Sequence, residues 1–326
     1  MNKPLAVYYD ILSFMPSSLE MLRERFELYT FVDPDAADPE VLARAQAVFA
    51  PKGFAMDAAA LDKHPRLRAI GTPTTGEVHI DVEAARARGV SVCSLKNERD
   101  LLLSITPTAE LAWGMVIWLV RHVPNAQDML LKGQWDGRSI GARTPRMLSR
   151  LRLGVIGLGR LGALVAGYGK ALGMEVCYFD PFVESSEFER CADVVTLATK
   201  SDVVSVHVHL TSETDRFLNA DFFRALPCGS YFVNTARGEV VDEPALLEAL
   251  RSGHLAGAAV DTLTGEHLPG FEAALPDNPM QRYAQESDSR LLLFPRYGGC
   301  TADAWELTEQ RVVEKMHAAC TAGGSI

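Results

Sequence analysis

The chain has 326 residues, of which 48% are hydrophobic and 23% charged, and its formal net charge is −10. This length exceeds what one hydrophobic core usually reaches, so we expect two domains. The apolar content excludes a disordered chain, and the negative charge argues against nucleic acid as a partner, because phosphate binding requires a basic surface.

The six cysteines are scattered and show neither a CxxC pair nor the His/Cys spacing of a metal site. We therefore expect buried, reduced thiols and no metal. The first residues enter a strand directly and lack the apolar segment of a signal peptide. The longest apolar run, around residues 112–120, is shorter than the ~20 residues of a membrane span. These features predict a cytoplasmic protein with no membrane partner.

Strand-like and helix-like stretches alternate from the start of the chain. The sequence predicts strands at Leu5–Tyr9, 47–50, 69–72 and 90–94, and helices at 17–25 and 81–88. Such alternation is typical of a parallel sheet with crossover helices. A long apolar helix is predicted over 108–122, with Pro107 near its first turn, where a missing N–H costs little. The polar segment 132–149 is predicted to be an irregular connection.

A second α/β pattern begins near Leu153. The predicted strands are Arg152–Ile156, Glu175–Phe179, 203–207, 231–234 and 257–261, and helices are predicted from the glycine turn to about Leu172 and over Glu243–Arg251. This block is a complete doubly wound unit. Residues 267–290 are polar and contain several prolines, so they are predicted to form a loop. A strand at 291–294 and a helix at 302–318 close the chain.

The run GLGRLG follows the strand Arg152–Ile156 directly and opens a helix. Gly157 permits a tight turn, Gly159 lets a pyrophosphate approach the backbone, and Gly162 allows the helix to pack closely on the strand. The start of the helix, at Arg160 and Leu161, offers N–H groups and a partial positive charge to the phosphates. The turn therefore predicts a dinucleotide site.

Asp180 ends the next predicted strand, 18 residues beyond Gly162. A carboxylate at this place can bind both hydroxyls of an adenosine ribose, and it would repel a 2′-phosphate. We therefore expect NAD rather than NADP. The alternative is that Asp180 only stabilises the turn before Pro181.

From Leu153 to Thr301 the chain resembles the D-isomer-specific 2-hydroxyacid dehydrogenases. The resemblance rests on four blocks, GVIGLGRLG (154–162), SDVVSVHVHLTSET (201–214), VNTARGEVVDEPALLEAL (233–250) and GAAVDTLTGE (257–266), and in part on FPRYGGCT (294–301). The segments GTPTTGEVHID (71–81) and SITPTAELAWG (104–114) are similar to the family's substrate-domain loop and interdomain helix. The resemblance implies a two-domain α/β protein in which a Rossmann-type doubly wound nucleotide domain, 106–293, is inserted into a smaller flavodoxin-like substrate domain made of 1–105 and 294–326.

The resemblance also implies an NAD-dependent enzyme that interconverts a 2-oxoacid and a D-2-hydroxyacid. Arg237 matches the arginine that holds the substrate, and Glu266 matches the glutamate that orients a histidine, although a solvated loop glutamate is the alternative. The backbone of Thr74, Thr75 and Gly76 would bind the substrate carboxylate. Further cofactor-binding residues are implied at His207, Thr235, Ala236 and Asp261.

A homodimer is expected, because the apolar helix 108–122 and the tryptophans Trp113, Trp118 and Trp135 offer more apolar surface than one lobe needs to cover.

The family's histidine is missing from its expected block. Where similar proteins have Pro-His-apolar-Gly, this chain has Pro295-Arg296-Tyr297-Gly298. An arginine keeps its proton at neutral pH and so cannot act as a general acid there, although it can hold an anion or pair with Glu266. His267 and Tyr297 are the candidate proton donors.

Three hypotheses stay open at this point. The first is a reductase of a 2-oxoacid with an altered proton donor. Lys96, Asn97 and Arg99 are then either a solvated charge run or a binding site for a second anionic group on the substrate. The second is a catalytically impaired NAD(H)-binding sensor or interaction protein of the same fold. The third is a hydride transfer that needs no protein acid.

Overall fold

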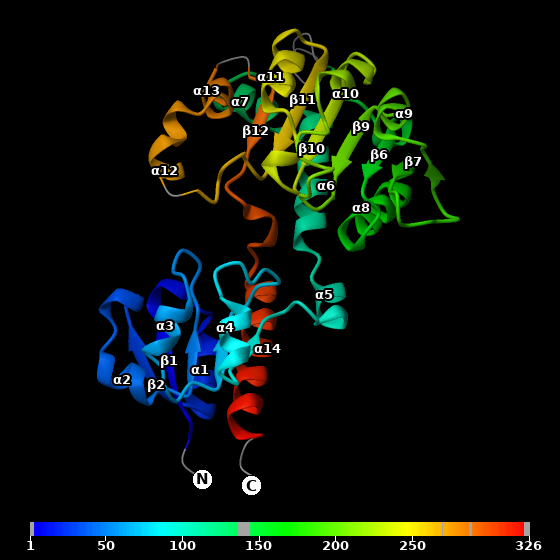
Figure 1. Ribbon diagram of the computed structural model, residues 1–326. Helices are drawn as coiled ribbons and strands as arrows, with labels where there is room; N and C mark the ends of the chain where they lie inside the picture. The colour runs from blue at the N-terminus through cyan, green and yellow to red at the C-terminus, as the bar shows by residue number, and fades with distance from the viewer. Residues whose placement is uncertain (1–2, 136–143, 269, 287–288, 323–326) are drawn as a thin grey trace. The chain divides into compact units, whose positions relative to one another are not determined.

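The computed structural model describes residues 3–135, 144–268, 270–286 and 289–322 (Figure 1). The chain forms two compact units, one made of Met1–Ile105 and Cys300–Ile326 and the other of Thr106–Gly299. The second unit is thus inserted into the first. Residues 294–299, which the sequence analysis assigned to the returning segment, group with the second unit.

The first unit is built on a five-stranded parallel sheet of order β2-β1-β3-β4-β5. Its strands are β1 (Leu5–Tyr9), β2 (Glu27–Phe31), β3 (Ala47–Phe49), β4 (Ala69–Gly71) and β5 (Ser91–Cys93). Every residue of the central strand β1 is buried, as expected of a strand covered on both faces. This strand order is the flavodoxin-like one, which confirms the predicted fold of this unit.

The helices of the first unit include one from the end of the chain. They are α1 (Pro16–Arg25), α2 (Pro39–Arg44), α3 (Ala58–Asp62), α4 (Val82–Ala87), α5 (Arg99–Ser104) and α14 (Ala302–Thr321). Helix α14 packs Val312 and Met316 into the core of this unit. The fit against β4 is close, because a Cβ at Gly71 would overlap the sulfur of Met316.

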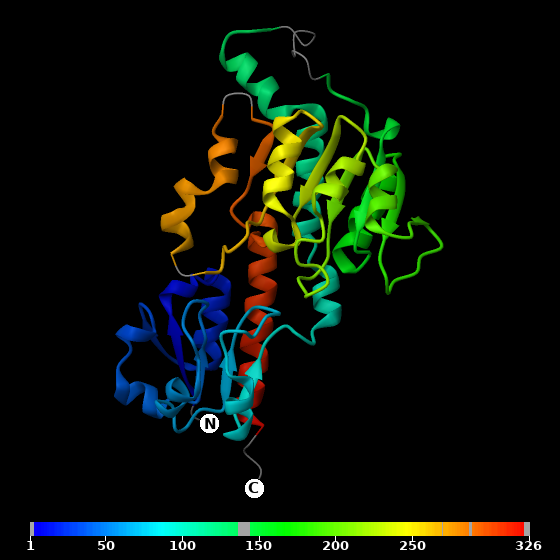
Figure 2. The same cartoon turned by 45° about the horizontal axis from the view of Figure 1, so that its top comes forward.

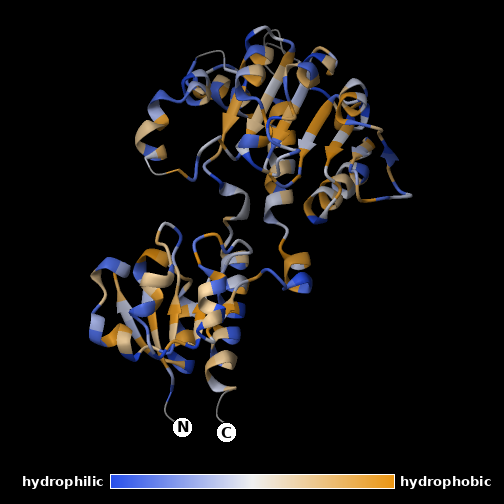
Figure 3. Cartoon of the chain, in the orientation of Figure 1, coloured by the Kyte–Doolittle hydropathy of each residue, from blue (hydrophilic) through white to orange (hydrophobic). Residues whose placement is uncertain are grey.

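The second unit is built on a seven-stranded parallel sheet of order β12-β11-β10-β9-β6-β7-β8. Its strands are β6 (Arg152–Ile156), β7 (Glu175–Phe179), β8 (Glu189–Arg190), β9 (Val203–Val206), β10 (Ser230–Asn234), β11 (Leu255–Val260) and β12 (Leu291–Leu293). From β8 to β11 the order is that of a Rossmann-type doubly wound sheet, as predicted. Figure 3 shows that the strands of both sheets are mainly hydrophobic, whereas the helices carry hydrophilic residues as well.

The second unit has helices on both faces of its sheet and also helices that bury no residue. They are α6 (Pro107–Arg121), α7 (Val123–Leu131), α8 (Arg160–Ala171), α9 (Val194–Thr199), α10 (Ala220–Ala225), α11 (Glu243–Arg251), α12 (Phe271–Ala274) and α13 (Pro279–Ala284). Those that bury no residue include α7 and α12. Side chains of Asp193, Asn219 and Asp242 accept backbone N–H groups at the starts of α9, α10 and α11. These caps fix where the helices begin.

Helix α6 is the main apolar helix of the second unit. Within the described residues, Arg99–Arg121 is the one helical stretch long and apolar enough to cross a membrane, with 39% of its apolar window buried. Met115, Val116 and Val120 of α6 are buried in the core of the second unit. The prediction of a buried helix here is therefore confirmed.

The prediction of a loop over 267–290 was wrong, because α12 and α13 lie within it. Pro279 occupies the first turn of α13, and the side chain of Asn278 accepts the N–H of Met280 at 2.8 Å. Asparagine and proline form turns, but the same residues also begin helices. Part of the predicted connection 132–149 lies outside the described residues.

Candidate active site

The glycine turn joins β6 to α8 at the carboxyl end of the second sheet. Gly157 has a φ of +88°, and a Cβ there would approach the carbonyl oxygen of His207 at 2.7 Å. A Cβ at Gly162 would overlap the carbonyl oxygen of Gly157, whereas the space beside Gly159 is open. Arg160 and Leu161 form the first turn of α8. The turn thus has the close packing and the open face that a pyrophosphate-binding loop needs.

Asp180 follows β7 and is buried, with 7% of its surface exposed. Its Oδ2 accepts the N–H of Leu158 at 2.7 Å, and its Oδ1 accepts those of Phe182 and Val183 at 2.8 and 2.9 Å. Asp180 therefore ties the glycine turn to the turn after β7. A carboxylate accepts about four hydrogen bonds, so a further acceptor position remains on Oδ2. Its predicted contact with a ribose stays a prediction.

Three buried polar atoms at the carboxyl ends of β9, β10 and β11 have no hydrogen-bond partner within the described part of the chain. They are Nδ1 of His207 and the hydroxyl oxygens of Thr235 and Thr262. The other ring nitrogen of His207 lies 2.8 Å from the hydroxyl oxygen of Ser205. Burial lowers the pKa of His207 to about 4, so its ring is neutral at neutral pH.

Buried polar groups are normally satisfied, so atoms without a partner at this edge indicate a polar ligand. Ligands of doubly wound sheets bind outside the carboxyl ends of the strands. Together with the glycine turn, these atoms fit a dinucleotide. The sequence analysis included His207, Thr235 and Ala236 but missed Thr262, which follows Asp261 directly.

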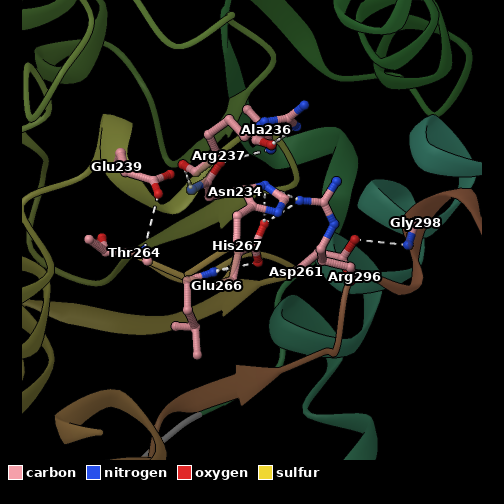
Figure 4. Close-up of polar contacts among 12 residues, drawn as sticks. Asn234, Ala236, Arg237, Glu239, Asp261, Thr264, Glu266, His267, Arg296 and Gly298 are labelled. Carbon is pink, nitrogen blue, oxygen red and sulfur yellow. Dashed lines mark hydrogen bonds and ion pairs between the residues drawn. The ribbon is translucent and has the colours of Figure 1, made fainter. Parts of the chain in front are cut away.

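A cluster of charged residues lies at the carboxyl ends of β10, β11 and β12 (Figure 4). Glu266 Oε1 forms an ion pair with Nη1 of Arg296, and the same Arg296 nitrogen lies 2.8 Å from Nε2 of His267. Glu266 Oε2 accepts the N–H of Leu263 at 3.1 Å. The Glu266 side chain is 7% exposed and that of Arg296 is 38% exposed. A buried carboxylate is thus paired with an arginine that faces solvent in part.

Arg237 is held just after β10 by the side chain of Asn234. Asn234 donates to the carbonyl of Arg237 at 2.8 Å and accepts the N–H of Ala236 at 2.9 Å. The residue as a whole is exposed, yet partial desolvation of its guanidinium lowers the pKa of Arg237. The positive charge of nearby Arg296 also lowers the pKa of Arg237, whereas the negative charge of Glu266 raises it. The structure therefore brings the three predicted catalytic residues into one electrostatic cluster.

Two further glutamates, missed by the sequence analysis, hold the backbone before Glu266. Oε1 of Glu243 accepts the N–H of Thr264 at 2.8 Å, and Oε1 of Glu239 accepts that of Gly265 at 3.1 Å. Burial raises the pKa of Glu243. The approach is close, because a Cβ at Gly238 would overlap the backbone of Leu263. The four-residue spacing of the two glutamates just after the ARG motif is the available sequence signal.

Asp261, predicted to bind the cofactor, is buried at the end of β11 with 4% of its surface exposed. Its carboxylate accepts the N–H groups of Tyr297 and Gly298 at 2.6 and 2.8 Å, and its carbonyl accepts that of Arg296 at 3.0 Å. Burial raises the pKa of Asp261, and the two N–H groups oppose this. Arg296 has a φ of +54°, which is uncommon for a residue other than glycine. Asp261 therefore fixes the backbone that carries Arg296.

The predicted substrate loop belongs to the first unit. The hydroxyl of Thr74 donates to the carbonyl of Gly76 at 2.7 Å, and Thr75 and Gly76 are exposed. Lys96, a candidate for binding a second anionic group, lies 3.2 Å from Oε2 of Glu77. Contacts of the loop residues Thr74 and Glu77 fix the shape of the loop. Binding of the substrate carboxylate by this loop stays a prediction.

Residues 113–284 match the NAD-binding domain of the D-isomer specific 2-hydroxyacid dehydrogenases. The chain is 31% identical over 268 residues to a glyoxylate reductase of Thermofilum pendens, covering 79% of this chain and 72% of that protein. It is 34% identical to the D-3-phosphoglycerate dehydrogenase of Bacillus subtilis over 78% of this chain, but it spans only 46% of that longer protein. A crystal structure of D-lactate dehydrogenase from Aquifex aeolicus, complexed with NAD and lactic acid, is similar with a TM-score of 0.74 and 26% identity, covering 96% of this chain and 94% of that one.

Proposed function

The chain belongs to the D-isomer specific 2-hydroxyacid dehydrogenase family, and we propose that it is an NAD-dependent enzyme that interconverts a 2-oxoacid and a D-2-hydroxyacid. The observation that carries the proposal is the cluster of Arg237, Glu266 and Arg296 at the carboxyl edge of the nucleotide-binding sheet. Relatives named for glyoxylate and D-lactate support this substrate class.

The cofactor, when bound, supplies or accepts the hydride. The glycine turn would hold its pyrophosphate, and the unpartnered hydroxyls of Thr235 and Thr262 and the Nδ1 of His207 would bind its polar groups. We propose NAD rather than NADP, because a 2′-phosphate beside Asp180 would bring like charges together in a partly desolvated site.

Arg237 would bind the substrate, since a guanidinium can hold the carboxylate and the neighbouring carbonyl oxygen in one fork. For the first unit we propose that the backbone of Thr74, Thr75 and Gly76 binds the substrate carboxylate. We further propose that Arg296 stands where related enzymes carry histidine. Its ion pair with Glu266 supports this, because that glutamate is the family's partner for the histidine. We also propose a substrate with a second anionic group, which the partly exposed guanidinium of Arg296 would bind.

The alternative function is a catalytically impaired NAD(H)-binding sensor or interaction protein. One observation favours it. Glu266 is paired with a guanidinium, which stays protonated at neutral pH and cannot give its proton to a substrate.

The deciding experiment is NADH oxidation with a panel of 2-oxoacids: glyoxylate, pyruvate, hydroxypyruvate, oxaloacetate and 2-oxoglutarate. Reduction of one of them by the purified chain supports the enzyme, and preference for the last two supports the second anionic group. NADH binding without turnover supports the sensor. Absence of NADH binding contradicts both.

We also propose a homodimer that pairs through the end of α6 and through α7. No described residue of α7 is buried within one chain, and Leu130, Leu131 and Trp135 are exposed. Figure 2 shows α7 extending beyond the end of the sheet. Trp113 does not belong to this surface, since it is buried and donates to the carbonyl of Val165 at 3.0 Å.

A cytoplasmic location is proposed as well. All six cysteines are thiols, as is usual for proteins of reducing compartments. Four of them are buried as expected, whereas Cys228 is exposed and Cys300 is half-buried.

A further inference from the structure

His267 lies beside the charged cluster and faces solvent, with its side chain 59% exposed. Its Nε2 lies 2.8 Å from Nη1 of Arg296 and 3.5 Å from Oε1 of Glu266 (Figure 4). One ring nitrogen therefore stands between a guanidinium and a carboxylate. These contacts come from a residue that follows Glu266 directly in the sequence.

The contact with Arg296 fits one protonation state of this ring, and the contact with Glu266 fits the other. A guanidinium has donors only, so Nε2 of His267 must accept from it, and the ring must then be neutral with its proton on Nδ1. A protonated Nε2 would instead oppose the Arg296 donor, and Oε1 of Glu266 would become its hydrogen-bond acceptor. The two neighbours thus favour opposite protonation states of one imidazole.

We propose that His267 is a catalytic residue of the proposed reaction, giving a proton to the substrate oxygen during reduction and taking it back during oxidation. The inference rests on the proposed function. The exposed ring first takes up a proton at Nε2 from solvent. Hydride addition to the ketone carbon then supplies two electrons and leaves a negative charge on the oxygen, which takes that proton from Nε2. The neutral ring then accepts from Arg296, and oxidation of the hydroxyacid runs these changes in reverse.

The other candidate donors fit this role less well. The His207 ring is buried, and it is neutral at neutral pH. Arg237 and Arg296 keep their protons at neutral pH. Tyr297 is 56% exposed, and among the described residues its hydroxyl makes no hydrogen bond to Glu266 or Arg296.

The charged groups that face His267 also decide how it responds to pH. Glu266 and Arg296 contact the His267 ring directly, and Arg237 interacts electrostatically with both of these residues. Glu239 and Glu243 fix the loop before Glu266, and Asp261 fixes the backbone of Arg296.

The first test is kinetic. His267→Gln keeps a polar side chain of similar size at an exposed position but cannot titrate. We expect it to lower kcat/KM for 2-oxoacid reduction by about 10²- to 10⁴-fold, with NADH affinity unchanged, and to remove the limb of the pH profile between pH 5 and 8. The matched control is His317→Gln, whose ring packs against Phe26 in the first unit and should leave both quantities unchanged.

The second test needs no turnover. Nitrogen NMR of ¹⁵N-histidine-labelled protein should show neutral His267 with its proton on Nδ1. Replacing the guanidinium by Arg296→Met should move that proton to Nε2, because the ring can then donate to Glu266. A proton on Nε2 in the wild-type protein would overturn the pairing and with it the proposal.

The outcomes separate this proposal from the proposed function. If the wild-type chain reduces a 2-oxoacid and His267→Gln matches it within about threefold at every pH, His267 is not the proton donor and the proposed function stands. If the wild-type chain reduces none of the acids, both proposals fail.

Discussion

Asp180 offers the sharpest test of cofactor choice, because it is buried and its two oxygens accept three backbone N–H groups. Two unit charges about 4 Å apart interact by about 4 kcal/mol at an effective dielectric constant of about 20. The three N–H groups and salt reduce the effect of the Asp180 charge. We therefore expect about 1.4–2.8 kcal/mol against a 2′-phosphate, so that NADPH should bind about 10- to 100-fold more weakly than NADH.

The informative variant is Asp180→Asn. Its amide oxygen can still accept from Phe182 and Val183, but its NH₂ group would face the N–H of Leu158. The unsatisfied N–H lowers the stability of the turn with or without cofactor. The variant also loses the charged acceptor proposed for the ribose hydroxyls, and a hydrogen bond to a charged group contributes about 1.5–3 kcal/mol, so NADH affinity should fall about tenfold or more. The loss of charge should also bring the two cofactors to within about threefold of each other, because the electrostatic difference disappears.

Fluorescence titration with NADH and NADPH measures both effects, and Asp193→Asn, which changes the cap of α9, is the control for loss of a charge. Raising the ionic strength from about 0.1 M to about 1 M shortens the Debye length from about 10 Å to about 3 Å. The ratio of NADH to NADPH affinity of the wild-type protein should therefore decrease. Equal binding of both cofactors by the wild-type protein, or unchanged discrimination in Asp180→Asn, would refute the reasoning.

Two further predictions concern stability and assembly. Burial raises the pKa of Glu243 above its unfolded value. As pH rises, the unfolded state therefore ionises first, and this carboxyl destabilises the fold. The difference in Tm between Glu243→Gln and wild type should increase above about pH 4.5, and a difference that does not change with pH would contradict this. By light scattering the wild-type chain should have twice the mass of one chain at micromolar concentration. Leu131→Glu should lower that mass while Val32→Glu, similarly exposed in the first unit, leaves it unchanged; a monomeric wild type would rule out the dimer.

The two sheets could be predicted because the signals that define them are local. Short apolar strands alternate with helices, and the glycine turn carries its own spacing requirements. The loop predicted over 267–290 failed for a local reason as well, since Asn278 and Pro279 begin a helix with the residues that would also make a turn.

The contacts that hold the site could not be predicted from the sequence, because they join distant segments. Asp261 accepts the backbone N–H groups of Tyr297 and Gly298, which lie 36 and 37 positions further along the chain. Glu243 accepts that of Thr264, which lies 21 positions further. A sequence pattern shows the acidic residue type but not its partner. For this reason the sequence could not show that Asp261 fixes the backbone of Arg296 or that Glu239 and Glu243 hold the loop before Glu266, and a cofactor contact of Asp261 stays a prediction.

A final prediction joins the two unusual residues of the cluster. If His267→Gln loses activity because an imidazole is missing, then a second imidazole placed against Glu266 should restore part of it. Arg296→His in the His267→Gln background provides one, and histidine tolerates the left-handed backbone of position 296 better than most residues. Glu266 would then orient and stabilise this ring in its charged form.

We expect the double variant to recover at least about tenfold in kcat/KM on pyruvate or glyoxylate, together with a pH dependence in the range where histidine titrates. KM for oxaloacetate should rise, since a cation proposed to bind its second carboxylate is lost. Arg296→Asn in the same background is the control, because asparagine also accepts a positive φ but carries no acid. Equal recovery with asparagine would mean that removing the guanidinium is sufficient, and neither imidazole would then be the proton donor.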